Sequence, residues 1–134
     1  MKRESIPAQI KKRLETAPPD VQRSINRLRE LILDVAREEP IGGVSETLKW
    51  NAPSYMARSG KGTTVRLEHK DQEYFVRVHC QSRVVERARA SGLSGLHYDG
   101  SRGLRFNDSH PLRKKDEQSV RKFIRLALTY HSWK

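Results

Sequence analysis

The chain has 134 residues, one cysteine and a formal net charge of +11 at pH 7, from 27 Lys and Arg against 16 Asp and Glu. This length is enough for one domain with its own hydrophobic core. One cysteine excludes an intramolecular disulfide framework, and no apolar run approaches the roughly 20 residues that cross a bilayer. The basic N-terminus lacks the apolar stretch of a signal peptide, so we expect a cytoplasmic protein.

The positive charge is concentrated toward the C-terminus. Residues 1–45 carry nine basic and seven acidic side chains, residues 46–99 carry nine and six, and residues 100–134 carry nine and three. Such an asymmetry favours polyanions or anionic ligands as partners. The alternative is a charged surface that only keeps the protein in solution.

Two segments with helical periodicity come first. Residues 1–18 are interpreted as a basic N-terminal arm, in which apolar residues at i+4 spacing allow a short helix, and residues 19–134 as a single domain. A long helix then begins near Asp20, which is a plausible N-cap, and stops before Pro40 and the glycines at 42–43. Its apolar residues alternate i+4 and i+3, which predicts one buried face: Val21, Ile25, Leu28, Ile32 and Val35.

A β region follows the long helix. Its second and third strands are expected to form a hairpin around residues 71–72, with Leu67 opposite Val76. Arg66 and Arg77 would then meet on the other face, where they need solvent or an anion. The three runs rich in β-forming residues are 54–58, 63–69 and 73–80.

The rest of the chain adds two helices and two short strands. Residues 82–92 are typical of a short helix with Ser82 as its cap and Gly92 after its end. Strands are expected at 96–98 and 104–106. We therefore expect an α+β domain with about five antiparallel strands, packed by N- and C-terminal helices in the order α-β-β-β-α-β-β-α. The last helix, from Asp116, is expected to bury Val120, Phe123, Ile124, Ala127 and Leu128.

One motif resembles a known family. Residues 46–50 read Glu-Thr-Leu-Lys-Trp, followed by Pro53 and Tyr55, with "GLRF" and a basic helix further on. From about Pro19 to Tyr130 the chain resembles the YdhG-like family of bacterial domains of unknown function. The resemblance implies a secretion-chaperone-like fold, whose related superfamilies include proposed DNA-binding proteins. One family member has been described as a frataxin-like iron chaperone. Neither function can be assigned to particular residues from the motif.

The same motif has two interpretations. As structure, it turns the chain from the helix into the sheet, where Trp50 and Tyr55 bury large areas. As a site, Lys49 and Tyr55 would line a pocket with Trp50 as its floor.

The main candidate site is the basic C-terminal set. Arg121 and Arg125 are stacked at i+4, where like charges repel by about 0.2–0.5 kcal/mol, and a bound phosphate would relieve this repulsion. No zinc-finger, aromatic RNA-binding or Walker-type motif is present, so only binding to a phosphate backbone, without sequence specificity, is expected. A solvated face remains the alternative. The set comprises Arg102, Arg105, Arg113, Lys114, Lys115, Arg121, Lys122 and Arg125.

Two other classes of function stay open. A metal (iron) chaperone could use Glu30, Asp34 and Glu38, spaced i, i+4, i+8, because carboxylates suit hard cations, although helix salt bridges also explain this ridge. A purely structural or interaction module, with self-association, is the third alternative. No catalytic motif is present, and Cys80 ends an apolar alternation that is typical of a core strand, so we expect neither an enzyme nor a cofactor.

Overall fold

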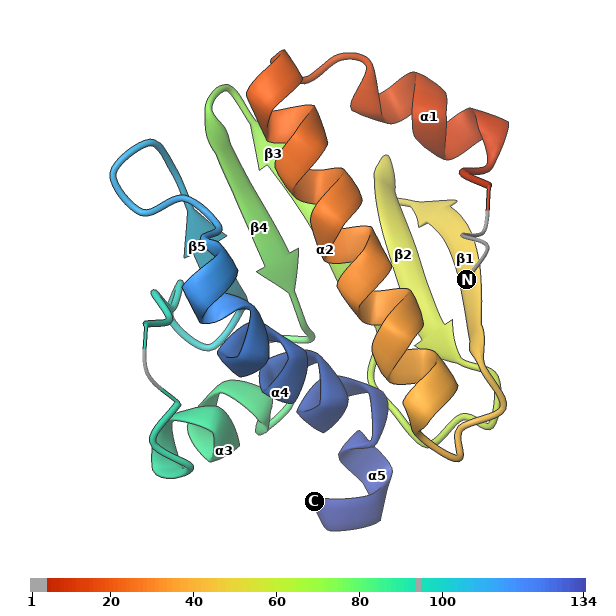
Figure 1. The fold of residues 1–134 in the computed structure, drawn as a ribbon. Helices are drawn as coiled ribbons and strands as arrows, with labels where there is room; N and C mark the ends of the chain where they lie inside the picture. The colour runs from red at the N-terminus through yellow and green to blue at the C-terminus, as the bar shows by residue number, and fades with distance from the viewer. Residues whose placement is uncertain (1–4, 94) are drawn as a thin grey trace.

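Five antiparallel strands form one sheet in the order β1-β2-β3-β4-β5 in the computed structural model, which describes residues 5–93 and 95–134. The expected α+β class with a five-stranded antiparallel sheet is confirmed. Helices α1, α2 and α4 lie on one face of the sheet (Figure 1). The strands are β1 (Val44–Lys49), β2 (Ala52–Ala57), β3 (Val65–Lys70), β4 (Glu73–Arg77) and β5 (Gly103–Phe106). The helices are α1 (Ala8–Leu14), α2 (Pro19–Glu38), α3 (Val84–Ala90), η1 (Lys114–Asp116), α4 (Glu117–Leu128) and α5 (Tyr130–Trp133).

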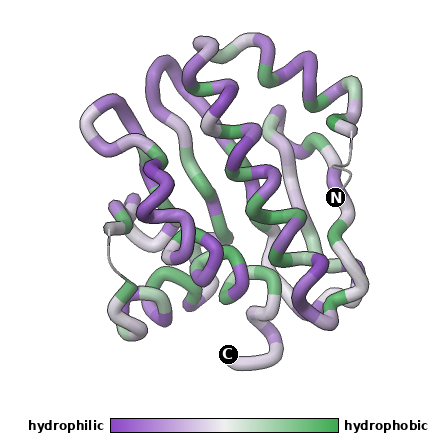
Figure 2. The backbone as a smooth tube through the Cα atoms, in the orientation of Figure 1, coloured by the Kyte–Doolittle hydropathy of each residue, from purple (hydrophilic) through white to green (hydrophobic). Residues whose placement is uncertain are grey.

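The long helix α2 crosses the sheet and supplies much of the core. It begins after Pro18, with Pro19 in its first turn, where the missing N–H costs no hydrogen bond. Asp20 is therefore inside the first turn rather than the expected N-cap, although its charge still favours the helix N-terminus. Figure 2 shows apolar and hydrophilic residues alternating along α2. The five apolar residues expected on its buried face are all buried.

The segment that the sequence analysis separated as an arm belongs in part to this core. Helix α1 contacts β1 and β2, and both Ile10 and Leu14 are buried there. The i+4 spacing of these residues gives α1 one apolar side, which covers the end of the β1–β2 pair (Figure 1). The domain thus includes residues 8–18, and residues 1–4 lie outside the described part.

The motif at residues 46–55 forms a β-hairpin rather than a turn from the helix into the sheet. Strands β1 and β2 pair with Glu46 opposite Tyr55 and are joined by a two-residue turn, Trp50-Asn51. Both turn residues have positive φ, 53° and 61°, which is typical of a type I′ turn.

The expected strand at 96–98 is reduced to a single bridge between Tyr98 and Leu104.

The β3–β4 hairpin has the expected register, with Leu67 opposite Val76 and Arg66 opposite Arg77. By contrast, β2 and β3 share only the pairs Ser54–Arg66 and Tyr55–Val65. The loop between them, residues 58–64, crosses to the end of α4 instead of closing a tight turn.

The backbone of this loop meets the backbone of α4 and α5. The Thr63 N–H donates to the Ala127 carbonyl (2.8 Å), and the His131 N–H donates to the Lys61 carbonyl (2.7 Å). A Cβ on Gly62 would lie 2.3 Å from the Leu128 carbonyl oxygen, so only glycine fits here.

The C-terminal elements largely follow the sequence pattern. The predicted buried residues of α4 are all buried. Gly92 follows the end of α3 with φ 68°, as expected, but Arg83 rather than Ser82 precedes the helix. Strand β4 ends at Arg77, so Cys80 lies exposed in the following turn and is not a core residue.

Candidate anion-binding site

The predicted basic set divides into two groups with different surroundings. Arg121 and Arg125 extend from α4 toward α2, where both form ion pairs with Glu38. Arg121 also lies 3.5 Å from Asp34, and Arg125 lies 3.3 Å from Glu39. The chain's own carboxylates therefore neutralise these two arginines, and their repulsion needs no bound anion.

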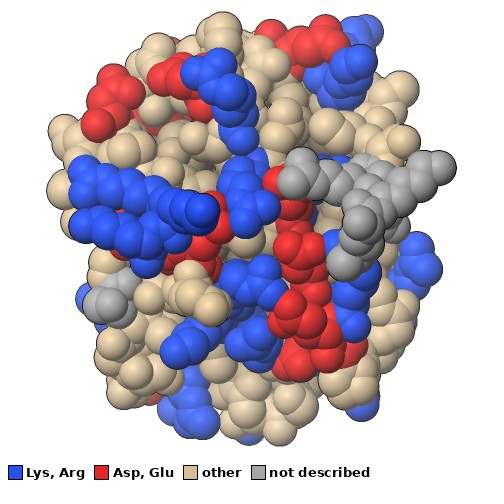
Figure 3. All heavy atoms as spheres, viewed as in Figure 1, with Lys and Arg blue, Asp and Glu red and all other residues tan. Residues whose placement is uncertain are grey.

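The same contacts occupy the carboxylates of the metal alternative. Asp34 and Glu38 pair with arginines of both helices, and Glu30 pairs with Arg27 at 3.0 Å. Figure 3 shows the result as a stripe of acidic side chains over α2 beside basic side chains of α4. Among the described residues, no three or more His, Cys, Asp or Glu side chains form a group that could hold a metal ion.

The other members lie in two places, at β5 and around the start of α4: Arg102 and Arg105 in the first, Arg113, Lys114, Lys115 and Lys122 in the second. Arg105 pairs with Glu73 on the open face of the sheet. Figure 3 shows basic side chains clustered over the start of α4. Within residues 5–93 and 95–134, five exposed members of the set make no ion pair: Arg102, Arg113, Lys114, Lys115 and Lys122.

A cavity of about 230 Å³ opens at the start of α4. Arg113 and Lys115 line it together with His97 and His110, whose rings stack with centroids 3.7 Å apart. Phe106, at the end of β5, forms an apolar part of the wall. We call this cavity the α4-start site.

Local hydrogen bonds fix the loop that carries His110. The Asn107 side chain accepts the N–H groups of Ser109 (3.0 Å) and His110 (2.9 Å), which holds a tight turn after β5. The Leu112 N–H donates to the Tyr74 hydroxyl (2.8 Å), which anchors the chain just before Arg113. The α4-start site is thus positioned by the sheet.

Two carboxylates moderate the charge of the site. Asp116 lines the cavity and approaches Gly95, whose Cβ position would be 2.4 Å from the Asp116 Oδ1. Glu117 points toward α2, where Arg27 donates to both its oxygens (3.0 and 2.6 Å) and lowers the pKa of this carboxyl. The cations still outnumber Asp116. Guanidinium, ammonium and imidazole N–H groups around one cavity can donate to phosphate oxygens, and the guanidinium can do so with two N–H groups at once.

The expected pocket of Lys49, Trp50 and Tyr55 does not form. Tyr55 is buried and donates its hydroxyl to Glu46 (2.7 Å), whereas Lys49 lies on the opposite face of the sheet. Trp50 is 88% exposed in the hairpin turn. The prediction of a buried Trp50 is wrong because a two-residue turn projects its side chains away from both faces.

Tyr55 belongs instead to a buried polar cluster that the sequence analysis missed. Arg29 of α2 donates to both Glu46 oxygens, at 2.5 and 3.0 Å, and to the Ser5 carbonyl. Burial, with the Glu46 charge as a lesser cause, raises the pKa of the Tyr55 hydroxyl. The only sequence signal was an arginine next to the apolar stripe of α2. The cluster joins α2 to β1 and β2.

The two arginines that meet on the open face of the sheet are also paired within the chain. Arg77 donates to Glu68 (3.1 Å) and to Asp99, and lies 4.0 Å from the Phe75 ring centroid. Arg66 lies 3.2 Å from Glu68. The hydrogen bond from Arg77 lowers the pKa of the Asp99 carboxyl. An external anion is not needed at this position.

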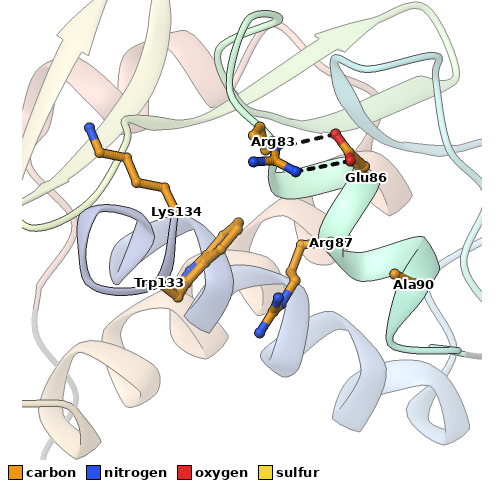
Figure 4. A pocket seen from close by; sticks show the side chains of 6 residues that line it. All are labelled: Arg83, Glu86, Arg87, Ala90, Trp133 and Lys134. Carbon is orange, nitrogen blue, oxygen red and sulfur yellow. Dashed lines mark hydrogen bonds and ion pairs between the residues drawn. The ribbon is translucent and has the colours of Figure 1, made fainter.

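A second basic cavity, of about 190 Å³, lies between α3 and α5 (Figure 4). Its cations have partners: Arg83 pairs with Glu86 (3.2 Å), and the Arg87 guanidinium lies 5.4 Å from the Trp133 ring centroid. Lys134 points its amino group away from both arginines. This cavity is therefore the weaker candidate for an anion.

In the parts of the chain that the structure describes, no helix combines the length and apolar character needed to cross a bilayer. Comparison with known proteins gives no assignment. No family model, curated protein or solved structure matches this chain.

Proposed function

We propose that this protein binds the phosphate groups of an anionic partner, a nucleic acid or a phosphorylated ligand, at the α4-start site. We further propose that it is a non-enzymatic cytoplasmic protein and, from the motif at 46–55, a member of the bacterial YdhG-like family. Binding is electrostatic and independent of base sequence, because no base-reading motif is present.

One observation carries the proposal. Arg113 and Lys115 line a concave site with two histidines and make no ion pair with described residues, whereas Arg121 and Arg125 are held by α2. Cations that the fold leaves without partners are the ones available to phosphate.

The test compares two triple variants that lose the same charge. In the first, Arg113, Lys114 and Lys115 become Gln. In the second, Arg121, Lys122 and Arg125 become Gln. Each is titrated with labelled single- and double-stranded DNA and with inorganic polyphosphate at two salt concentrations.

The first variant is expected to bind more weakly and with a shallower salt dependence. Each lost phosphate contact reduces the slope of log K against log salt by about 0.7–0.9. The second variant is expected to stay close to wild type, because two of its three side chains are already paired. Equal losses in both variants would mean that only net charge matters. Absence of binding at low salt to all probes would overturn the proposal.

A further inference from the structure

Trp50 has a conformation and exposure that stability does not explain. Its side chain is 88% exposed, and both Trp50 and Asn51 occupy the left-handed region. Such turns favour Asn-Gly, and a bulky residue with positive φ is strained. An exposed aromatic ring in a strained turn therefore suggests a contact outside the chain.

The topology places this turn at the same end of the sheet as the α4-start site. Because neighbouring strands are antiparallel, β1, β3 and β5 run in the same direction. The turn at 50–51, the turn at 71–72 and the loop from 107 to 113 therefore leave the sheet at one end (Figure 1). With strands about 4.8 Å apart, roughly 15–20 Å separates the Trp50 turn from the end of β5.

Helix α1 adds positive charge beside Trp50. Its last turn contains three basic residues, of which Arg13 lines a cavity of about 210 Å³ with Trp50 and His69. Thr16 and His69 share a hydrogen bond of 3.0 Å, which ties the end of α1 to β3.

Two lysines add positive charge to this end of the sheet, on the face opposite α1 and α4. Lys49 and Lys70 are the last residues of β1 and β3, at the same end of the sheet. Both are exposed and make no ion pair among the residues described. The acidic residues near them are largely engaged: Glu68 pairs with Arg66 and Arg77. Asp71 is the remaining acidic residue of the β3–β4 turn.

We propose that this end of the sheet binds single-stranded nucleic acid, with Trp50 stacking on a base while the strand's phosphates extend to the α4-start site. This inference rests on the proposed function and narrows its partner. Proteins that bind single strands without sequence preference combine a basic surface with exposed aromatic rings. In a duplex the paired bases are already stacked, so Trp50 has no base face to contact.

The experiment uses the full chain with Trp133→Phe. The chain has two tryptophans, so Trp50 is then the only one left. Its fluorescence is measured during titration with oligothymidylate of about ten nucleotides, within the length range of such sites. An abasic phosphodiester of the same length supplies the phosphates without the bases. Duplex DNA and anionic phospholipid vesicles are run in parallel.

Oligothymidylate is expected to quench the fluorescence of Trp50 and to bind about tenfold more tightly than the abasic strand. Stacking of one base on an aromatic ring is enough to give this ratio of affinities. Trp50→Asn, titrated with fluorescently labelled strands because it lacks the Trp50 signal, is expected to abolish this advantage while leaving binding of the abasic strand unchanged. Trp50→Phe should retain most of it, because phenylalanine still presents a ring face. Both variants are expected to fold, since the side chain is exposed.

The outcomes separate the two proposals. Equal affinity for thymidylate and abasic strands in wild type overturns the stacking inference and leaves the phosphate proposal intact. Abasic binding that is unaffected by the Arg113, Lys114, Lys115 triple variant overturns the phosphate proposal. Quenching by vesicles but not by oligothymidylate would assign Trp50 to a lipid surface and overturn the inference.

Discussion

Replacing Arg29 by Met is expected to destabilise the domain by about 3–5 kcal/mol, because the Glu46 carboxylate then loses its buried counter-charge. Arg29 is 4% exposed, and its guanidinium donates to both Glu46 oxygens at 2.5 and 3.0 Å. The Glu46 side chain is 14% exposed and keeps the Tyr55 hydroxyl at 2.7 Å, which favours the lower end of this range.

The assay is equilibrium unfolding in urea, followed by far-ultraviolet circular dichroism. Domains of this size have unfolding free energies of roughly 5–15 kcal/mol, so the loss is a large fraction of the total. Tyr55→Phe, which removes one hydrogen bond to a carboxylate, is expected to cost about 1.5–3 kcal/mol. A double variant, Arg29→Met with Glu46→Leu, should recover much of the loss because no buried charge remains.

A loss below about 1 kcal/mol for Arg29→Met would contradict this reasoning, because that is the range of exposed ion pairs. A double variant no more stable than Arg29→Met alone would show that the pair acts through packing rather than charge.

Three further predictions concern single positions. Gly62→Ala is expected to lower the free energy of unfolding by about 1–3 kcal/mol, because its Cβ would clash with the Leu128 carbonyl, and urea midpoints equal to wild type would contradict this. Burial, and secondarily Arg13, lowers the pKa of His69. Stability should therefore decline as pH falls from 6.5 toward the lowered folded pKa, and His69→Gln should flatten that part of a Tm–pH profile, with an unchanged profile counting against it. Trp50→Asn should raise stability by about 0.5–1 kcal/mol in thermal unfolding, because Asn tolerates positive φ, and a lower Tm would count against strain at this turn.

Periodicity predicted the elements whose buried face repeats regularly. The apolar residues of α2 and α4 lie at helical spacing, and the alternation in β3 and β4 fixes their register, since a slip of one residue would expose Leu67 and Val76. The first strand was missed because its turn, Trp50-Asn51, lacks the glycine that usually marks a two-residue hairpin.

The ion-pair partners of charged side chains were harder to predict than the buried faces of helices and strands. Spacing shows that Arg121 and Arg125 share a side of α4, but not that this side faces Glu38, which lies more than 80 residues earlier. The two charged ridges that sequence reasoning treated as separate candidate sites are one interhelical ion-pair network. Trp50 was expected in the core because large aromatic residues are usually buried. It is exposed because it lies in the two-residue turn, which the sequence did not indicate.

The short pairing between β2 and β3 divides the sheet into the β1–β2 hairpin and the β3–β4–β5 part, and we expect the hairpin to unfold more readily. Only two residue pairs among the described residues join the β1–β2 hairpin to β3. The loop at 58–64 makes its backbone hydrogen bonds to α4 and α5 instead. Amide hydrogens of β1 and β2 are therefore expected to exchange with solvent through a partial opening that leaves β3, β4 and β5 protected. Because the hairpin also carries Trp50, this opening is expected to move the ring without unfolding of the strands that position the α4-start site.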